Sequence, residues 1–188
     1  MEDLSLHILD IVENATAAGA KRIEIVIEED RRADRLRLTI RDDGRGMDER
    51  MLARVRDPFT TTRTTRRVGL GIPLLEQSAR EAGGRLDIRS APGKGTEVVA
   101  EFQAGHIDRR PLGDMAETLI ALLLGHPAVD FRFEHTIDGE SSCVDTRELR
   151  EQLREVPLTD ARVLALIRDL LGRPPGEERE AGKGEDHE

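Results

Sequence analysis

The chain has 188 residues, of which 37% are hydrophobic and 36% are charged, and its formal net charge is −9. This length accommodates one domain of ordinary size, or one domain with a smaller appendage. The net negative charge argues against broad electrostatic binding to nucleic acid or to an anionic membrane. The absence of Trp and Tyr removes the side chains on which nucleic-acid bases usually stack.

Cysteine content and the amino terminus predict the compartment. Cys143 is the sole cysteine, which excludes an internal disulfide and a cysteine metal cluster and favours a reducing, cytoplasmic setting. The opening residues, MEDLSLHILDIVENA, carry acids where a signal peptide needs bases. No apolar run approaches the ~20 residues that a transmembrane helix needs. We therefore expect neither export by that route nor a membrane span.

The first hundred residues alternate between helical and strand periodicity. Helical spacing predicts helices over residues 4–18, 48–56 and 72–84. Alternation of apolar and charged residues predicts strands over 22–29, 35–42, 85–90 and 96–103. This order predicts an α+β fold, a two-layer α/β sandwich with helices on one face of a largely antiparallel sheet.

The character of the chain changes after about residue 104. We predict a small α-β-β-α-α appendage over 105–171, followed by a disordered acidic tail over 172–188. Its helices are expected near 114–125, 146–154 and 159–171, the last capped by Thr159, and its strands near 129–135 and just before 145. Two of these helices carry amphipathic stripes, which could pack on the first part of the chain or on a second copy in a homodimer.

The first motif is ILDIVENATAAGA at residues 8–20. Asp10 and Asn14 are four residues apart, so they project from one face of the predicted helix. Mg²⁺ takes oxygen ligands, often one or two from protein with phosphates and water completing the octahedron, and the Asn14 carbonyl would serve as one. A carboxylate one turn away could orient or deprotonate a nucleophile. A plain solvated helix face would show the same spacing.

The second motif is RDDGRGMD at residues 41–48, directly after a predicted strand. Gly44 and Gly46 allow a backbone to approach a ligand closely. Asp42 can accept a hydrogen bond from an exocyclic amine such as that of adenine, because an ionised carboxylate only accepts. The alternative is an ordinary Asp-Gly turn.

The third motif is TTTRTTRRVGLGIPLL at residues 60–75. Gly69 and Gly71 precede a predicted helix, so free backbone N–H groups and the positive end of the helix dipole could meet a phosphate there. The preceding threonines can donate hydroxyls, and the arginines add positive charge to an acidic protein. A mobile surface loop is the alternative.

The order and spacing of the motifs carry more information than any one of them. The segments ENATAAGA, DDGRGMD, DPFTTTR, GLGI and GKGTEVVAEF closely resemble the N, G1, F, G2 and GT boxes of the GHKL superfamily. This superfamily comprises histidine-kinase catalytic domains, gyrase-type ATPases, MutL and the heat-shock chaperone ATPases. The resemblance covers residues 4–103 and implies a Bergerat-type sandwich that binds ATP and Mg²⁺ between helices and sheet.

The resemblance also implies roles for individual residues. Asn14 would bind Mg²⁺, Asp42 would bind the adenine amine, and Thr96 resembles the threonine that supports this aspartate through hydrogen bonding. Residues 57–71 would form an ATP lid with Phe59 as its apolar anchor. Further nucleotide contacts would come from glycines and lid residues, namely Gly44, Gly46, Thr62, Arg63, Gly69, Leu70 and Gly71.

Departures from the family pattern leave the reaction open. Asp10 stands where MutL-like and anti-sigma kinase members carry a Glu base and histidine kinases usually carry Asn, so Asp10 is a candidate base. Only three residues precede the first helix, so the hairpin bearing a phosphoacceptor histidine is not expected, and the family's usual first strand is missing too. The leading prediction is a Mg²⁺-ATP-dependent phosphotransferase that acts on a separate protein in signalling. The alternatives are a nucleotide-gated binding module with little turnover and, disfavoured by the short acidic chain, a MutL- or gyrase-like ATPase clamp.

Overall fold

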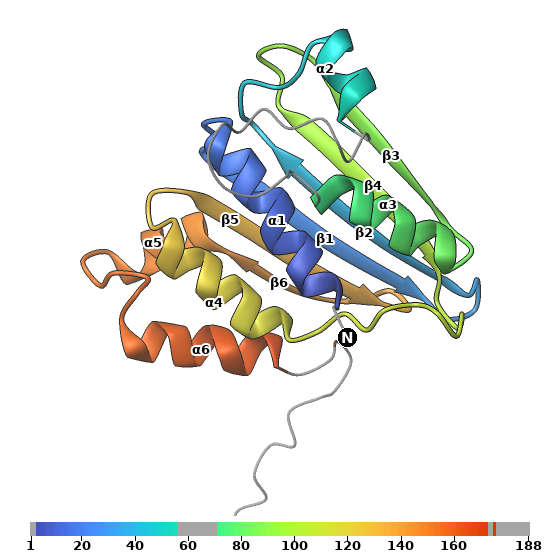
Figure 1. The fold of residues 1–188 in the computed structure, drawn as a ribbon. Coiled ribbons are helices and arrows are strands. Elements are labelled where there is room, and N and C mark those ends of the chain that lie inside the picture. The colour runs from blue at the N-terminus through green and yellow to red at the C-terminus, as the bar shows by residue number, and fades with distance from the viewer. Residues whose placement is uncertain (1–2, 56–70, 173–174, 176–188) are drawn as a thin grey trace, which may run out of the picture.

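The sheet is the framework of the protein. The computed structural model describes residues 3–55, 71–172 and 175. Six strands form one sheet in the order β3-β4-β2-β1-β5-β6 (Figure 1). Neighbouring strands are antiparallel except β1 and β5, which are parallel, so the prediction of a largely antiparallel sheet is confirmed. The strands are β1 (Arg22–Asp30), β2 (Arg35–Asp42), β3 (Arg85–Ser90), β4 (Thr96–Gln103), β5 (Asp130–Ile137) and β6 (Glu140–Asp145).

Helices cover one face of this sheet. The described helices are α1 (Leu4–Ala17), α2 (Glu49–Arg54), α3 (Gly71–Glu81), α4 (Met115–Gly125), α5 (Thr146–Leu153) and α6 (Ala161–Leu171). Figure 1 shows α1, α3 and α4 lying across the same face, which confirms the predicted two-layer α/β sandwich. The predicted cap at Thr159 is wrong, because Asp160 precedes α6 and its side chain accepts a hydrogen bond from the backbone N–H of Arg162.

Period-two alternation explains why the two faces differ. Ile23, Ile25 and Ile27 of β1 are at most 1% exposed and lie under the helices. Ile40 and Leu38, the β2 partners of Ile25 and Ile27, are buried as well, so these two cross-strand pairs add to a single core. Burying side chains of this size contributes about 1.5–3 kcal/mol each. The hydrophobic pattern therefore fixes which face of each strand meets the helices.

The opposite face of the sheet is polar and carries ion pairs between neighbouring strands. Glu97 of β4 lies between Arg41 of β2, at 2.5 Å, and Arg89 of β3, at 3.6 Å. Opposite charges at facing positions stabilise a solvated sheet surface modestly. This arrangement accounts for the high charge content without placing charge in the core.

Residues 105–171 extend the sheet formed by the first part of the chain. β5 pairs in parallel with β1, so that Phe131 faces Ile23 and Phe133 faces Ile25. All four side chains belong to the core cluster that also contains α1 and α3 residues. The division at residue 104 into two parts stays a prediction, but both parts contribute to one sheet and one core.

An ion pair joins β1 to the start of α5. Arg22 Nη2 donates to Asp145 Oδ2 at 2.9 Å, and Asp145 is 7% exposed and caps α5. Burial by itself raises the pKa of Asp145, but hydrogen bonds from the Arg22 side chain and the Arg147 backbone outweigh it, so the pKa is lowered overall. The carboxylate is therefore stabilised by its partners in the folded state.

We expect Arg22→Ala to lower the free energy of unfolding by about 2 kcal/mol, because it leaves a buried carboxylate without its charged partner. Arg31→Ala is the control, since Arg31 is exposed and lies 3.8 Å from Asp138, and its loss should cost less than about 0.5 kcal/mol. A group with a lowered folded pKa contributes stability above its ordinary pKa, here 3.8, and this contribution is lost as the pH falls through the folded pKa. Urea denaturation at pH 7 and pH 3 should therefore give a smaller difference at pH 3; equal differences would contradict the assignment.

Candidate functional site

The predicted N and G2 boxes meet where α3 begins. Asp10 and Asn14 lie one helical turn apart on α1, with Asp10 exposed and Asn14 partly exposed. Gly71, the first residue of α3, is buried against α1, and a Cβ added to it would lie 2.7 Å from the Cβ of Asp10. Only glycine allows the start of α3 to come this close. The structure thus brings the candidate base beside the positive end of a helix.

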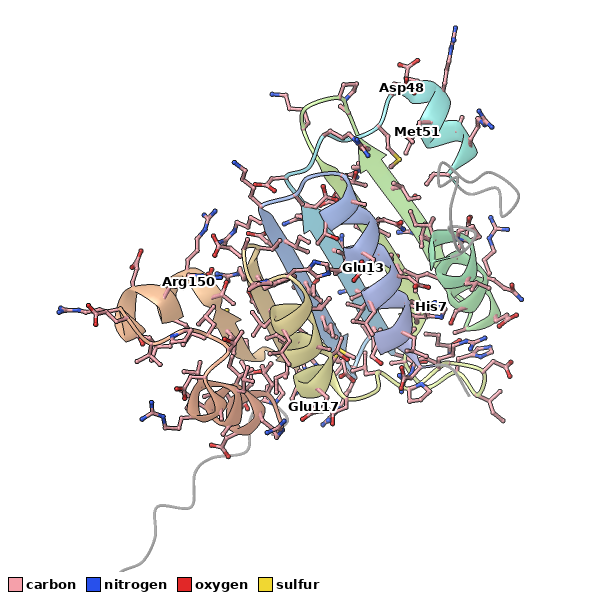
Figure 2. All side chains as sticks on the ribbon, turned by 60° about the vertical axis from the view of Figure 1, so that its left-hand side comes forward. His7, Glu13, Asp48, Met51, Glu117 and Arg150 are labelled. Atoms are coloured by element: carbon pink, nitrogen blue, oxygen red, sulfur yellow. The ribbon has the colours of Figure 1, made fainter. Side chains whose placement is uncertain are left out.

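Glu13 points away from this meeting point, although it is next to Asn14 in sequence. Its carboxylate lies 2.8 Å from Nε2 of His126, the C-cap residue that follows α4. Figure 2 shows Glu13 on α1 among the helices of the covered face. Glu13 therefore contributes to the contact between α1 and α4.

The loop that contains Gly44 and Gly46 is held by backbone contacts on both sides. The Arg45 N–H donates to the carbonyl of Ala18 at 3.0 Å, and the Arg45 carbonyl accepts from Gly93 N–H at 2.7 Å. Gly46 has φ +66°, and a Cβ there would lie 2.0 Å from the Ala91 carbonyl oxygen. The loop therefore packs between the end of α1 and the β3–β4 turn.

Asp42, at the end of β2, carries an unusual carboxylate. Its burial raises its pKa, while hydrogen bonds from the backbone of Gly44 and Thr96 oppose that effect. The Gly44 N–H lies 2.8 Å from Oδ1. Perturbed pKa values cluster at functional sites, so this partly buried carboxylate beside a glycine-containing loop is a candidate site residue.

Thr96 and a residue missed by the sequence analysis, Ser90, lie in the same row as Asp42. Strand register places Ser90 opposite Thr96 and Thr96 opposite Asp42, on the face covered by helices. The Thr96 hydroxyl contacts Ser90 Oγ at 2.9 Å, and it is the Thr96 backbone that bonds to Asp42. The position of Ser90 at the end of a predicted strand, opposite Thr96 across a short turn, could have identified it.

Most of the predicted lid lies outside the described residues, including Thr62, Arg63, Gly69, Leu70 and Phe59. Of the predicted site residues that the structure describes, Asp10 and Gly71 adjoin each other, and Asp42, Gly44, Gly46 and Thr96 form a second group. The end of α1 links the two groups, because Ala18 contacts Gly44 and accepts from Arg45. How each residue contacts a nucleotide stays a prediction.

The oxygen donors at this site suit Mg²⁺ brought by a nucleotide. Within residues 3–55, 71–172 and 175, no cluster of three or more His, Cys, Asp or Glu side chains could hold a metal ion. The Asn14 carbonyl and the Asp10 carboxylate could supply one or two oxygens. Mg²⁺ commonly keeps waters and phosphate oxygens as its other ligands, so this small donor set fits.

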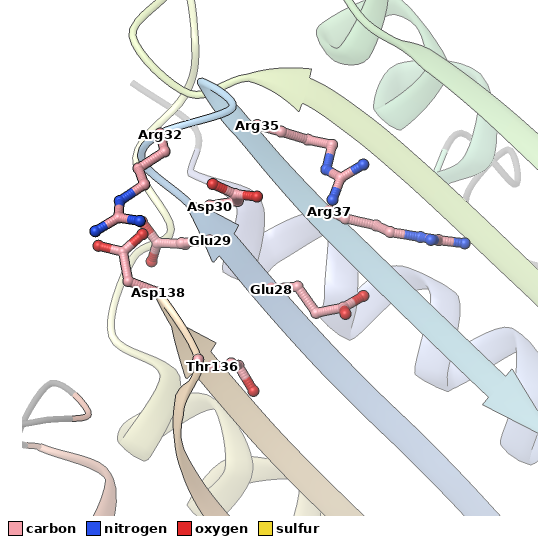
Figure 3. Close-up of a pocket in the computed structure, with 9 residues that line it drawn as sticks. Glu28, Glu29, Asp30, Arg32, Arg35, Arg37, Thr136 and Asp138 are labelled. Carbon is pink, nitrogen blue, oxygen red and sulfur yellow. The ribbon is translucent and has the colours of Figure 1, made fainter.

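A cavity of about 480 Å³ lies elsewhere, at the far end of β1 and β2. Figure 3 shows that its wall includes Arg35 and Arg37 on β2 together with Glu28 and Asp30 on β1. These residues are cross-strand neighbours, Glu28 opposite Arg37 and Asp30 opposite Arg35. Because the lining carries four carboxylates and three arginines, this cavity does not favour a triphosphate. Among the helices that the structure describes, none has the length and apolar character to cross a membrane.

Comparison with known proteins agrees with this geometry. Residues 2–106 match the model of the family described as histidine kinase-, DNA gyrase B- and HSP90-like ATPase. The chain is 44% identical over 89 residues to the sensor protein kinase FleS of Pseudomonas aeruginosa, covering 47% of this chain and 22% of that protein. It is 30% identical over 88 residues to sporulation kinase C of Bacillus subtilis, covering 47% of this chain and 20% of that protein. The chain thus spans about a fifth of the length of these curated relatives.

A solved structure shares the fold. The crystal structure of the N-terminal domain of a DNA repair protein superposes with a TM-score of 0.55 and 15% identity, covering 77% of this chain and 52% of that one. At this identity the likeness concerns the fold alone. The family match covers more than half of the chain, and it coincides with the segments that form the site. The chain belongs to the histidine kinase-, DNA gyrase B- and HSP90-like ATPase family.

Proposed function

We propose that this chain is a Mg²⁺-ATP-dependent phosphotransferase that acts on a separate protein in signalling. The observation that carries the proposal is the contact between Gly71 at the start of α3 and Asp10 on α1. This contact brings a carboxylate to a helix N-terminus, and Asn14 follows one helical turn later on α1. The kinase names of the sequence relatives support transfer over simple hydrolysis, although those proteins are much longer.

Each residue would have a distinct task. Asp42 would accept a hydrogen bond from the adenine amine, with Gly44 holding its carboxylate. Asn14 would hold Mg²⁺, and the N–H groups that open α3 would face the phosphates. When bound, Mg²⁺-ATP supplies the transferable phosphoryl group and a cation that neutralises part of its charge. Asp10 would accept the proton of the attacking side chain.

We expect Asp10→Asn to slow phosphoryl transfer about 100-fold, the low end of what a general base contributes, while ATP affinity changes by less than about threefold. Labelled ATP and candidate acceptor proteins would measure transfer, and calorimetry would measure affinity. Glu13→Gln is the control, because Glu13 is one residue from Asn14 but contacts His126. Unchanged transfer in Asp10→Asn would refute a base at this position, and ATP binding without transfer or hydrolysis in the parent would refute the phosphotransferase.

A nucleotide-gated binding module is the second candidate, and one series of contacts favours it. Asp43, next to Asp42, accepts hydrogen bonds from the backbone N–H groups of Lys21 and Arg22 at 2.7 and 2.9 Å. Arg22 in turn pairs with Asp145 at the start of α5. A conformational change in the loop that follows Asp42 could therefore be transmitted to α5 without hydrolysis or transfer of the phosphoryl group. If function in cells survives Asp10→Asn but is lost in Asp42→Asn, binding rather than transfer is what matters.

A further inference from the structure

Ser90 is the centre of a small hydrogen-bond network behind Asp42. Its hydroxyl oxygen lies 2.8 Å from the backbone nitrogen of Met47 and 2.8 Å from the carbonyl oxygen of Gly95. It also lies 2.9 Å from the hydroxyl oxygen of Thr96. Ser90 thus joins the loop that contains Gly44 and Gly46 to the turn that precedes Thr96.

Proton counting fixes the direction of each bond. A backbone N–H can only donate and a carbonyl can only accept, so Met47 donates to Ser90 and Ser90 donates its single proton to Gly95. In the contact between the two hydroxyls, Ser90 therefore has only a lone pair to offer. Thr96 must donate its proton to Ser90.

This direction determines what Thr96 can offer to anything else. With its proton committed, the Thr96 hydroxyl can only accept further hydrogen bonds. Its neighbour in the row, Asp42, also only accepts when ionised, and Oδ1 already receives the Gly44 N–H. The two polar side chains at the end of β2 and the start of β4 thus present acceptors alone.

We propose that Ser90 is a positioning residue for base specificity. It orients the Thr96 hydroxyl so that the side chains at the proposed adenine site, Asp42 and Thr96, only accept hydrogen bonds and select a purine with a 6-amino group over one with a 6-oxo group. The inference rests on nucleotide binding at Asp42, as in the proposed function, but not on phosphoryl transfer. An oxo group placed against acceptors would lose its hydrogen bond to water and gain none. Without Ser90, the Thr96 hydroxyl could rotate and donate to that oxo group.

The test compares ATP with GTP on the full chain by calorimetry, with Ser90→Ala, Ser90→Thr and the parent. We expect the ratio of ATP affinity to GTP affinity to fall about tenfold in Ser90→Ala. The Thr96 hydroxyl could then donate to the oxo group of guanine, and one hydrogen bond of ordinary strength accounts for a change of this size. Ser90→Thr keeps the hydroxyl and should restore the ratio to within about twofold of the parent. A purely structural role would weaken both nucleotides by the same factor, and that result would overturn the proposal.

A second variant keeps the test decisive if Ser90→Ala fails to fold. Thr96→Val removes the hydroxyl that Ser90 orients, so it should also reduce the ATP-to-GTP ratio, whereas Thr96→Ser should preserve it. An unchanged ratio in Thr96→Val would overturn the proposal. If the parent binds ATP selectively but transfers no phosphoryl group, the phosphotransferase falls and the role of Ser90 stands; if the parent binds neither nucleotide, both fall.

Discussion

Replacing Asp42 with Asn should weaken ATP binding at least about 1000-fold and at the same time raise the melting temperature. The loss of affinity follows because the asparagine amide either turns N–H groups toward the adenine amine or loses its bond to Gly44. A site built to bind a donor discriminates by factors of this size when its polar groups are left unpaired. Calorimetry with Mg²⁺-ATP measures the first effect and thermal denaturation without nucleotide measures the second.

The gain in stability follows from the pKa of Asp42. Burial raises that pKa, so the ionised carboxylate is less favourable in the folded chain than in the unfolded chain. A group with a raised folded pKa stabilises the fold below its unfolded pKa, and this contribution is lost as the pH rises through the folded pKa. At neutral pH the neutral amide should therefore be the more stable form, by about 2 °C in melting temperature.

Asp43→Asn is the matched control, because the pKa of the adjacent carboxylate is shifted in the opposite direction. Burial by itself raises the pKa of Asp43, but hydrogen bonds from the backbone of Arg22 and Lys21 outweigh it, and the pKa is lowered overall. Asparagine at 43 should therefore lower the melting temperature at neutral pH. If both variants moved the melting temperature in the same direction, the pKa shift of Asp42 would not explain its effect.

The local elements could be predicted from the sequence because their signals are local. Alternation of apolar and charged residues defines β1 and β2, and the same alternation decides that Ile23 faces the helices and Glu24 does not. The order of the motifs identified Asp10, Asn14 and Asp42 as site candidates. The helices and strands required only periodicity within short segments, whereas the roles of the site candidates came from the resemblance of the ordered motifs to the GHKL boxes.

Contacts between distant segments could not be predicted in this way. The pairing of β5 with β1 joins residues more than a hundred positions apart, and an apolar alternation in β5 fits many partners. The sequence predicted that Gly71 lies where a helix begins and faces a phosphate, but only the packed structure identifies Asp10 as its neighbour. Ser90 was missed because a serine at a strand end has no distinctive signal of its own, and only the short turn to the next predicted strand indicates that it lies opposite Thr96.

Gly95→Ala should lower the free energy of unfolding by at least about 3 kcal/mol, well beyond the usual effect of a point substitution. Gly95 has φ +73°, and a Cβ there would lie 1.8 Å from the carbonyl oxygen of Asp42. The added atom must displace the backbone that positions Asp42, so ATP affinity should fall together with stability. Urea denaturation and calorimetry on the same preparations would measure the two effects.

Gly93 separates the steric effect from the conformational one. It lies two residues earlier in the same turn with φ +71°, but a Cβ there would meet nothing within 4 Å. Gly93→Ala should therefore cost only the strain of an L-residue at positive φ, about 1–2 kcal/mol, and should leave ATP affinity within about twofold of the parent. The difference between the two variants in free energy of unfolding measures how tightly the β3–β4 turn packs against the backbone of Asp42. Equal losses of unfolding free energy at both positions would mean that the turn can move away from Asp42. The hydrogen bonds of Ser90 and Thr96 would then not hold the proposed adenine site rigidly.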